Sequence, residues 1–363
     1  MLPGIPIPRL SVPPAGGPLS AISDGIAPSG DAMRVGPVAA IPEVMADLGV
    51  DAEEVFSRVR VDAGAFANPD IRLPTATLAA LAHQASTLGN CPHFGLLVGD
   101  RARLSSFGSI GSLMRHSARV VDALRTFVLK FHIHDWGGAP VLARIEGSTV
   151  ILGYSVFRLS PITIRYPYDA ATGILFQTLR DLCGPEFRPS AIAFAYPRPP
   201  DIDYYRRHFG CKLVFEAPLT GVLFDKAWLA KPLADAQPNA LRDLVRRVAR
   251  EAARQETTFS RRVELAIQQM LLGGTATEPA VANLLNVSKR TLRRRLGHEG
   301  EKFRSLLGER RCELAQQLLR NTSLAVADIA SALQYKDANA FSRAFRTWAN
   351  QSPTEWRARA RGL

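Results

Sequence analysis

The sequence lacks most features that mark membrane proteins, secreted proteins and disulfide-stabilised proteins. Its 363 residues include only four cysteines, which are scattered and form no Cys-x-x-Cys pair: Cys91, Cys183, Cys211 and Cys312. This scatter indicates structural thiols in a reducing cytoplasm. No apolar run approaches the roughly 20 residues of a membrane-spanning helix. The N-terminal stretch MLPGIPIPRLSVPPAGG has no uninterrupted apolar core, which argues against a signal peptide.

Familiar catalytic motifs are missing as well. No GxSxG, HExxH, P-loop or GxGxxG occurs in a supporting context, so we expect no enzyme. His132 and His134 alternate in FHIHD, which would place both on one face of a strand, with Asp135 next. A metal site needs three or four converging ligands, so surface or polar-core histidines explain this pair better. We therefore expect neither a metal nor a cofactor.

Positive charge is abundant but unevenly placed. The chain carries 45 Lys and Arg against 33 Asp and Glu, a net charge of +12. Residues 257–363 hold 18 of the basic and 9 of the acidic residues, a balance of +9, whereas residues 1–256 hold 27 and 24. A basic module joined to a nearly neutral one indicates nucleic acid or an anionic membrane as the partner of the C-terminal part.

Composition and periodicity divide the chain into four parts. Residues 1–37 hold eight prolines and six glycines and are predicted to form a disordered tail. Residues 38–235 mix helical segments such as LPTATLAALAHQASTLG with strand-like ones such as TVILGYSV, which predicts an α+β domain. Residues 236–256 contain a connector helix. Residues 257–363 carry seven short helical segments with almost no strand signal, which predicts an all-α domain.

The connector helix is amphipathic, and two interpretations of it stay open. It is a helix lying on a domain face, or a helix that pairs with its copy in a homodimer. The apolar stripe consists of Leu241, Leu244, Val245, Val248 and Ala252.

An internal repeat lies within the helical part. AVANLLNVSKRTLRRRL (280–296) matches DIASALQYKDANAFSRAF (328–345), at an offset of 48 in the first helix and 49 in the second. Each copy consists of a helix, a short turn and a second helix, so the chain contains two helix-turn-helix motifs. The matched pairs are Val281 with Ile329, Ala282 with Ala330, Leu285 with Leu333, Leu292 with Phe341 and Leu296 with Phe345.

The second helix of each copy turns polar side chains away from the core. At about 100° per residue from Leu292, Leu296 also faces the core, whereas Arg290, Arg293 and Arg294 face outward. Arg bonds guanine edges, Asn bonds adenine edges, and Ser bonds either, while the flanking basic residues are suited to phosphates. Ser288 is the expected N-cap. The candidate DNA-contacting residues are Lys289, Arg290, Arg293, Arg294 and Arg295 in the first copy and Asn339, Ser342, Arg343 and Arg346 in the second.

A predicted helix of about 20 residues, Glu301 to Arg320, joins the two copies. It would span about 30 Å. Successive major-groove faces on one side of a duplex repeat every ~34 Å. One chain could therefore read two adjacent boxes without dimerising.

The tandem motif resembles the DNA-binding domain of the AraC/XylS family of bacterial transcription regulators. The most specific match is IASALQYKDANAFSRAFRTWANQSPTEWR (329–357). The sequence departs from the family pattern at Gln334-Tyr335, where Gly-Phe is usual, and at Asn350, where Gly is usual. The matching residues are Ile329, Ala330, Phe341, Arg343, Phe345, Arg346, Ser352, Pro353, Trp356 and Arg357.

The N-terminal part resembles the arabinose-binding-type sensor domain of one branch of that family, a name that does not imply arabinose. The resemblance rests on the PHFGL segment and on CGPEFRPSAIAFAYPRPPDIDYYRRHFGCKLVFEA. It implies a transcription activator that binds promoter DNA, RNA polymerase and a small-molecule effector. An apolar pocket with a few polar anchors is expected. By chemistry alone, Arg165, Tyr166 and Tyr168 are candidates for an anionic effector, and an ordinary loop with interface aromatics is the alternative.

Two functions therefore compete. The first is an effector-responsive transcription regulator. The second is a small-molecule-binding or enzymatic domain whose basic C-terminal part only localises it.

Overall fold

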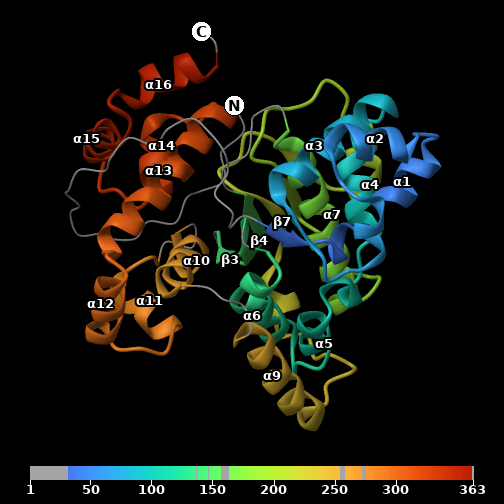
Figure 1. The fold of residues 1–363 in the computed structure, drawn as a ribbon, viewed down its shortest axis with the longest axis horizontal. Helices are drawn as coiled ribbons and strands as arrows, with labels where there is room; N and C mark the ends of the chain where they lie inside the picture. The colour runs from blue at the N-terminus through green and yellow to red at the C-terminus, as the bar shows by residue number, and fades with distance from the viewer. Residues whose placement is uncertain are drawn as a thin grey trace.

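Two parts of different architecture make up the chain (Figure 1). The structure is a computed structural model that describes residues 32–135, 137–145, 147–156, 163–253, 258–271 and 275–361. An α+β part ends with α9 (Pro238–Ala253), and an all-helical part begins with α10 (Phe259–Leu271). The predicted α+β and all-α classes are both confirmed.

The α+β part begins before the boundary predicted at residue 37. Strand β1 (Ala32–Arg34) pairs antiparallel with β2 (Arg72–Pro74), and Val35 behind it is fully buried. That boundary is wrong because a count of prolines and glycines cannot register a pairing with a strand 40 residues further along. The rest of the predicted tail, residues 1–31, lies outside the described residues.

A five-stranded sheet with the order β3-β4-β7-β5-β6 forms the centre of the α+β part. All neighbours pair antiparallel except β5 and β6, which are parallel. The strand-like segment TVILGYSV forms β4 and is buried along almost its whole length, as its largely apolar composition predicts. The strands are β3 (Gly138–Arg144), β4 (Thr149–Val156), β5 (Ala191–Ala193), β6 (Lys212–Val214) and β7 (Thr220–Asp225).

Helix α7 packs on β4 and β7 and, on its other side, against α4. Gly99 allows the close approach of α4 and α7, because a Cβ atom there would lie 2.2 Å from the carbonyl oxygen of Ala170. The helices of this part are α1 (Ile41–Asp47), α2 (Ala52–Val59), α3 (Thr75–Leu88), α4 (Phe94–Asp100), α5 (Ser109–Arg115), α6 (Val120–Lys130), α7 (Arg165–Cys183) and α8 (Asp203–Phe209). Five short 3-10 helices complete its described elements: η1 (Gly36–Val38), η2 (Ala63–Ala67), η3 (Leu104–Phe107), η4 (Phe131–Ile133) and η5 (Lys226–Ala230).

The FHIHD segment is not the predicted strand. Phe131–Ile133 forms η4, directly after α6. His132 is partly exposed, whereas His134 is fully buried and lies edge-on to Phe107. Alternation misled the prediction because Phe131 and Ile133 enter the core from a 3-10 turn, in which successive side chains do not alternate between two faces.

The connector helix lies on the α+β part, as the first of its two interpretations proposes. α9 packs beside α5, and Leu241, Leu244 and Val248 join the core of that part (Figure 1). Val245 is 50% exposed, and the side chain of Ala252 lies outside the description.

The helical part contains two small cores, one for each repeat. Leu292 and Leu296 belong to the first and Phe341 and Phe345 to the second, while Met270 and Leu307 are partly buried and pack against both. The helices after α10 are α11 (Glu278–Leu284), α12 (Lys289–His298), α13 (Phe303–Asn321), α14 (Val326–Ala332), α15 (Ala338–Ala349) and α16 (Pro353–Ala360).

Candidate nucleic-acid interface and ligand pocket

The two helix-turn-helix motifs have the same turn geometry. In the first, the N–H of Val287 donates to the carbonyl of Ala282 over 2.9 Å; in the second, that of Tyr335 donates to Ala330 over 2.8 Å. The residue before each donor, Asn286 or Gln334, has a φ of 53° or 63°. Because these positions are 48 residues apart, the structure confirms the repeat that the sequence predicts.

Gln334 shows how the turn forms without the glycine that is usual in the family. A positive φ is costly for most residues other than glycine, so it persists where the surrounding structure fixes the residue. The amide Nε2 of Gln334 is buried and donates to the carbonyl of Leu271 over 2.7 Å. Asn350 also lies in the left-handed region, with a φ of 55°, at the C-cap of α15.

Helix α12 begins as the sequence predicts. The Ser288 hydroxyl accepts a hydrogen bond from the Thr291 N–H over 3.1 Å, which makes Ser288 the N-cap. Leu292 and Leu296 are buried, with 0% and 1% of their surface exposed. The five candidate basic residues are all exposed: Lys289, Arg290, Arg293, Arg294 and Arg295.

The four arginines among these five basic residues divide into two groups. Arg293 forms a bidentate ion pair with Glu278 of α11, with both N···O distances at 2.6 Å, and this pair lowers the pKa of the Glu278 carboxyl group. The Arg295 guanidinium lies 5.3 Å from the centre of the Phe259 ring. The guanidinium groups of Arg290 and Arg294 make no hydrogen bond or ion pair with any described residue.

Helix α15 presents a less basic outer face. Asp337 is its N-cap and accepts from the Ala340 N–H over 2.7 Å. Phe341 and Phe345 are fully buried. Asn339, Arg343 and Arg346 are exposed, and Ser342 is half-buried.

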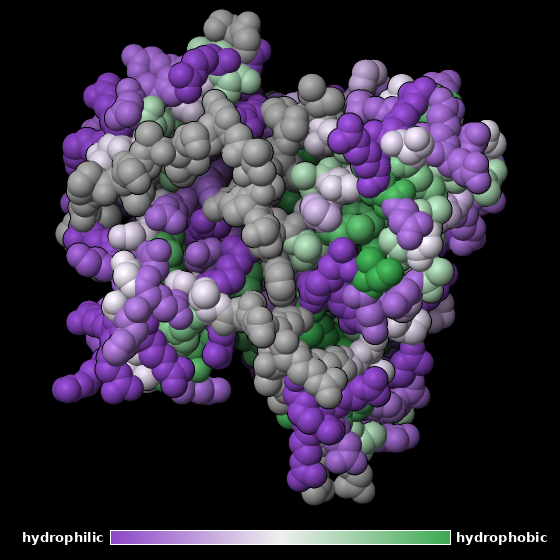
Figure 2. Space-filling view, viewed as in Figure 1, coloured by the Kyte–Doolittle hydropathy of each residue, from purple (hydrophilic) through white to green (hydrophobic). Residues whose placement is uncertain are grey.

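Helix α13 separates the two motifs. It has 19 residues and therefore spans about 28 Å. α12 lies near its N-terminal end and α15 near its C-terminal end (Figure 1). The α+β part does not cover the outer faces of these helices, because their side chains are exposed with both parts present. Hydrophilic side chains dominate this region of the surface (Figure 2).

The three predicted effector residues lie in the first turn of α7 and point to different places. Arg165 donates to the Tyr205 hydroxyl over 2.9 Å and lies 3.5 Å from the Asp169 carboxylate. Asp169 is buried and also accepts from the hydroxyls of Tyr205 and Tyr196. Burial raises the pKa of Asp169 to about 6, and the Arg165 guanidinium opposes that rise. The positive charge of Arg165 is thus already compensated within the domain.

Tyr168 links the two parts of the chain. Its buried hydroxyl accepts a hydrogen bond from Nε2 of Gln317, on α13. A second bond joins the hydroxyl of Ser323 to the Glu216 carboxylate, and α10 packs beside β3. The first turn of α7 therefore contacts the linker helix of the DNA-binding motifs directly.

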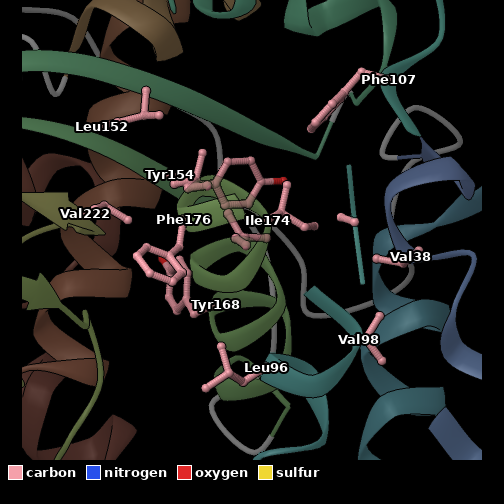
Figure 3. Packing of buried hydrophobic residues seen from close by; sticks show 14 of the residues in the cluster. Val38, Leu96, Val98, Phe107, Leu152, Tyr154, Tyr168, Ile174, Phe176 and Val222 are labelled. Carbon is pink, nitrogen blue, oxygen red and sulfur yellow. The ribbon is translucent and has the colours of Figure 1, made fainter. Parts of the chain in front are cut away.

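Tyr166 borders an apolar cavity of about 70 Å³ between α3, α4, α7 and β4. Five of its lining residues come from five elements and appear in Figure 3: Val38, Val98, Phe107, Tyr154 and Ile174. The cavity also touches His134, which the sequence predicts to be a surface or polar-core histidine and not a ligand-binding residue. The one local signal for its burial is its position after the apolar Phe131 and Ile133.

The described residues form neither a metal site nor a membrane-spanning helix. No group of three or more His, Cys, Asp or Glu side chains there could hold a metal ion. None of the described helices combines the length and the apolar character that a bilayer crossing requires.

Two equivalent helix-turn-helix motifs at the ends of one helix, beside a separate α+β domain, define a transcription regulator. Comparison with known families agrees. The model described as "Arabinose-binding domain of AraC transcription regulator, N-term" matches residues 49–233, and a helix-turn-helix domain model matches residues 281–359. The chain belongs to the AraC family of transcriptional regulators.

Named relatives match over nearly their whole length. The chain is 27% identical to the ornithine utilization regulator of Pseudomonas aeruginosa, over 88% of this chain and 94% of the relative. It is 25% identical to the transcriptional regulator VirS of Mycobacterium tuberculosis, over 87% and 93%. The crystal structure of the regulator CdpR from Pseudomonas aeruginosa covers 84% of this chain and 96% of its own, at 23% identity and a TM-score of 0.40.

Proposed function

We propose that this regulator is a promoter-specific activator whose DNA binding is controlled by a small molecule held in the α+β part. One observation supports it most: α12 and α15 expose donor-rich faces at opposite ends of a ~28 Å helix. In this proposal Arg290, Arg294, Asn339 and Arg343 face bases, and Lys289 and Arg346 contact phosphates. Arg293, Arg295 and Ser342 have secondary roles at the edges of the interface.

Other partners follow from this assignment. RNA polymerase is the second macromolecular partner of an activator, and the bacterial cytoplasm is its compartment. A homodimer is not required, because one chain already carries two recognition helices. We assign the chain no catalytic activity.

Footprinting on the region upstream of its own gene tests the proposal. We expect two protected boxes about one helical turn apart, near 10 base pairs from centre to centre. Binding should also weaken steeply with salt, as phosphate contacts release counterions. Uniform weak coverage without boxes would instead support the basic part as a localising device.

The route of control in this proposal is the contact between α7 and α13. Because Tyr168 bonds Gln317, the contact can restrict the small adjustment by which α12 and α15, at the ends of a ~28 Å helix, fit the ~34 Å repeat of the grooves. Tyr168→Phe removes the hydroxyl and keeps the ring, so the effector-free variant should bind promoter DNA more tightly than the wild type. Tyr204→Phe, a half-buried tyrosine on α8, is the control. Equal affinities for wild type and Tyr168→Phe would contradict this route.

The name of one relative suggests ornithine as an effector candidate, whereas the name of the matched domain model does not imply arabinose. The lining of the cavity is the observation that bears on the chemical class of the effector.

A further inference from the structure

His134 is a buried polar residue whose ring nitrogens are unpaired among the described residues. Its side chain is fully buried, and neither Nδ1 nor Nε2 has a hydrogen-bond partner among the described residues. Its ring instead meets aromatic rings, with centroid distances of 5.3 Å to Phe107 and 5.5 Å to Phe131. Buried polar groups in native proteins are nearly always paired, so an unpaired imidazole needs a physical explanation.

His134 lines the cavity beside α7, and the side chains of the other polar lining residues, Thr75, Tyr154 and Tyr166, already have partners. The Tyr154 hydroxyl donates to Asp135, and the Tyr166 hydroxyl lies 3.2 Å from Nδ1 of His83. Among the described lining residues, His134 alone has buried side-chain nitrogen or oxygen atoms without a partner. The site therefore offers one polar anchor on an otherwise apolar wall.

The anchor is uncharged. Burial lowers the pKa of His134 well below its usual range, and the nearby positive charges of Arg34 and Arg72 lower it further. A neutral imidazole has one donor and one acceptor nitrogen. Arg34 pairs with Asp70, and Arg72 donates to the carbonyl oxygens of Ile133 and His134, so these cations are directed toward other groups.

The wall of the cavity excludes charged and highly polar ligands. An ionised group placed there would lose its hydration without gaining a counter-ion. A sugar would bury several hydroxyls and an amino acid two charges, against a single available partner. The volume of about 70 Å³ is roughly half that of an apolar cavity known to hold benzene, so the ligand must be small.

We propose that this cavity is the effector site and that its ligand is a small, uncharged, mostly apolar molecule with one hydroxyl or carbonyl group bonded to His134. The role as effector rests on the proposed function, whereas the binding itself does not. Phenol, an apolar ring with a single hydroxyl, is a suitable probe, and its binding requires the cavity walls to open by a small amount.

Thermal shift and calorimetry on the full chain test the binding. Phenol should raise the melting temperature saturably, because it binds the folded state alone. Toluene, which lacks the hydroxyl, should bind about tenfold more weakly, the effect of one hydrogen bond. Benzoate, arabinose and ornithine should give no shift. A larger shift with any of these three than with phenol would overturn the proposed ligand class.

Two variants make the assignment to His134 specific. His134→Phe should weaken phenol binding about tenfold and leave toluene binding unchanged. His132→Phe changes a neighbouring histidine that does not line the cavity, and it should bind phenol like the wild type. If His134→Phe does not fold, Ala82→Leu fills the cavity from α3 and should abolish the shifts of both phenol and toluene. Wild-type phenol affinity in His134→Phe, or in a folded Ala82→Leu, would refute the site.

Promoter binding in the presence of phenol distinguishes ligand binding in the cavity from control of DNA binding by that ligand. A saturable phenol shift with unchanged promoter affinity would refute effector control through this cavity while leaving the ligand site in place. Absence of any probe binding, in a protein whose footprint still shows two boxes, would refute the site and leave the regulator intact.

Discussion

The two helix-turn-helix motifs share a backbone but differ in what they present to solvent. α12 exposes Lys289, Arg290 and Arg294, whereas the equivalent face of α15 exposes Asn339 and Arg343. Phosphate contacts supply affinity that depends on salt but not on sequence, while bonds to base edges supply specificity. The first motif is therefore suited both to phosphate contacts and to base recognition, whereas the second is suited mainly to base recognition.

The cores beneath these faces differ too. Leu292 and Leu296 fill the first, whereas Phe341 and Phe345 fill the second and meet further rings of Tyr335, Trp348 and Trp356. The same turn bond forms in both, from Val287 to Ala282 and from Tyr335 to Ala330. The turn geometry thus tolerates different cores, and the outer face varies independently of both.

The largest expected effect is on the aromatic core of the second motif. Phe345→Ala removes a fully buried ring and should lower the free energy of unfolding by about 3–5 kcal/mol. Phe345→Leu is the milder control. Leu292→Ala should lower the free energy of unfolding by about 2–5 kcal/mol in the first motif.

Met270 and Leu307 pack against both cores, so circular dichroism should show one unfolding transition for the helical part. Two separate transitions would show that the cores are independent.

Substitutions on the outer faces should affect binding more than stability. Arg294→Ala and Asn339→Ala should each weaken promoter binding by about 1–3 kcal/mol and relax selectivity at one base position. The two positions should fall in different protected boxes, which a panel of single-base promoter variants can measure. Arg250→Ala, an exposed arginine on α9, is the matched control. Wild-type affinity in either variant would remove that residue from the interface.

A smaller effect distinguishes phosphate contacts from base contacts. Lys289→Ala should weaken binding almost equally for all sequences and reduce the slope of log affinity against log salt by about one. Asn339→Ala should leave that slope unchanged. Titrations at four or more salt concentrations measure both. Equal slopes for Lys289→Ala and the wild type would place Lys289 away from phosphate.

The sequence predicts the repeat well because its signals are local. The Ser288 cap and the buried Leu292 and Leu296 follow from spacing within one helix. Strand β4 likewise follows from its own apolar run. The pairing of β1 with β2 and the burial of His134 depend on residues far away in the chain, so periodicity could not reveal them.

The same limit applies to the arginines of α12. Helical angles place Arg293 on the outer face beside Arg290 and Arg294, and all three are exposed. Only the position of Glu278, which comes from the preceding helix, shows that Arg293 is already paired. An arginine held this way is less available to a base edge.

Breaking the pair between Arg293 and Glu278 should have the smallest effect and should strengthen DNA binding instead of weakening it. Glu278→Gln removes a negative charge beside α12 and releases Arg293, so affinity for non-specific DNA should rise a few-fold, by less than about 1 kcal/mol. Glu53→Gln makes the same charge change on distant α2 and should leave affinity unaltered. The Arg293 pair lowers the pKa of Glu278 in the folded protein, so its small stabilisation is present above the ordinary pKa of glutamate and disappears as pH falls below it. The wild type should therefore lose this small part of its free energy of unfolding in acid, whereas Glu278→Gln should not. Weaker DNA binding by Glu278→Gln would mean that the paired Arg293 itself contacts DNA.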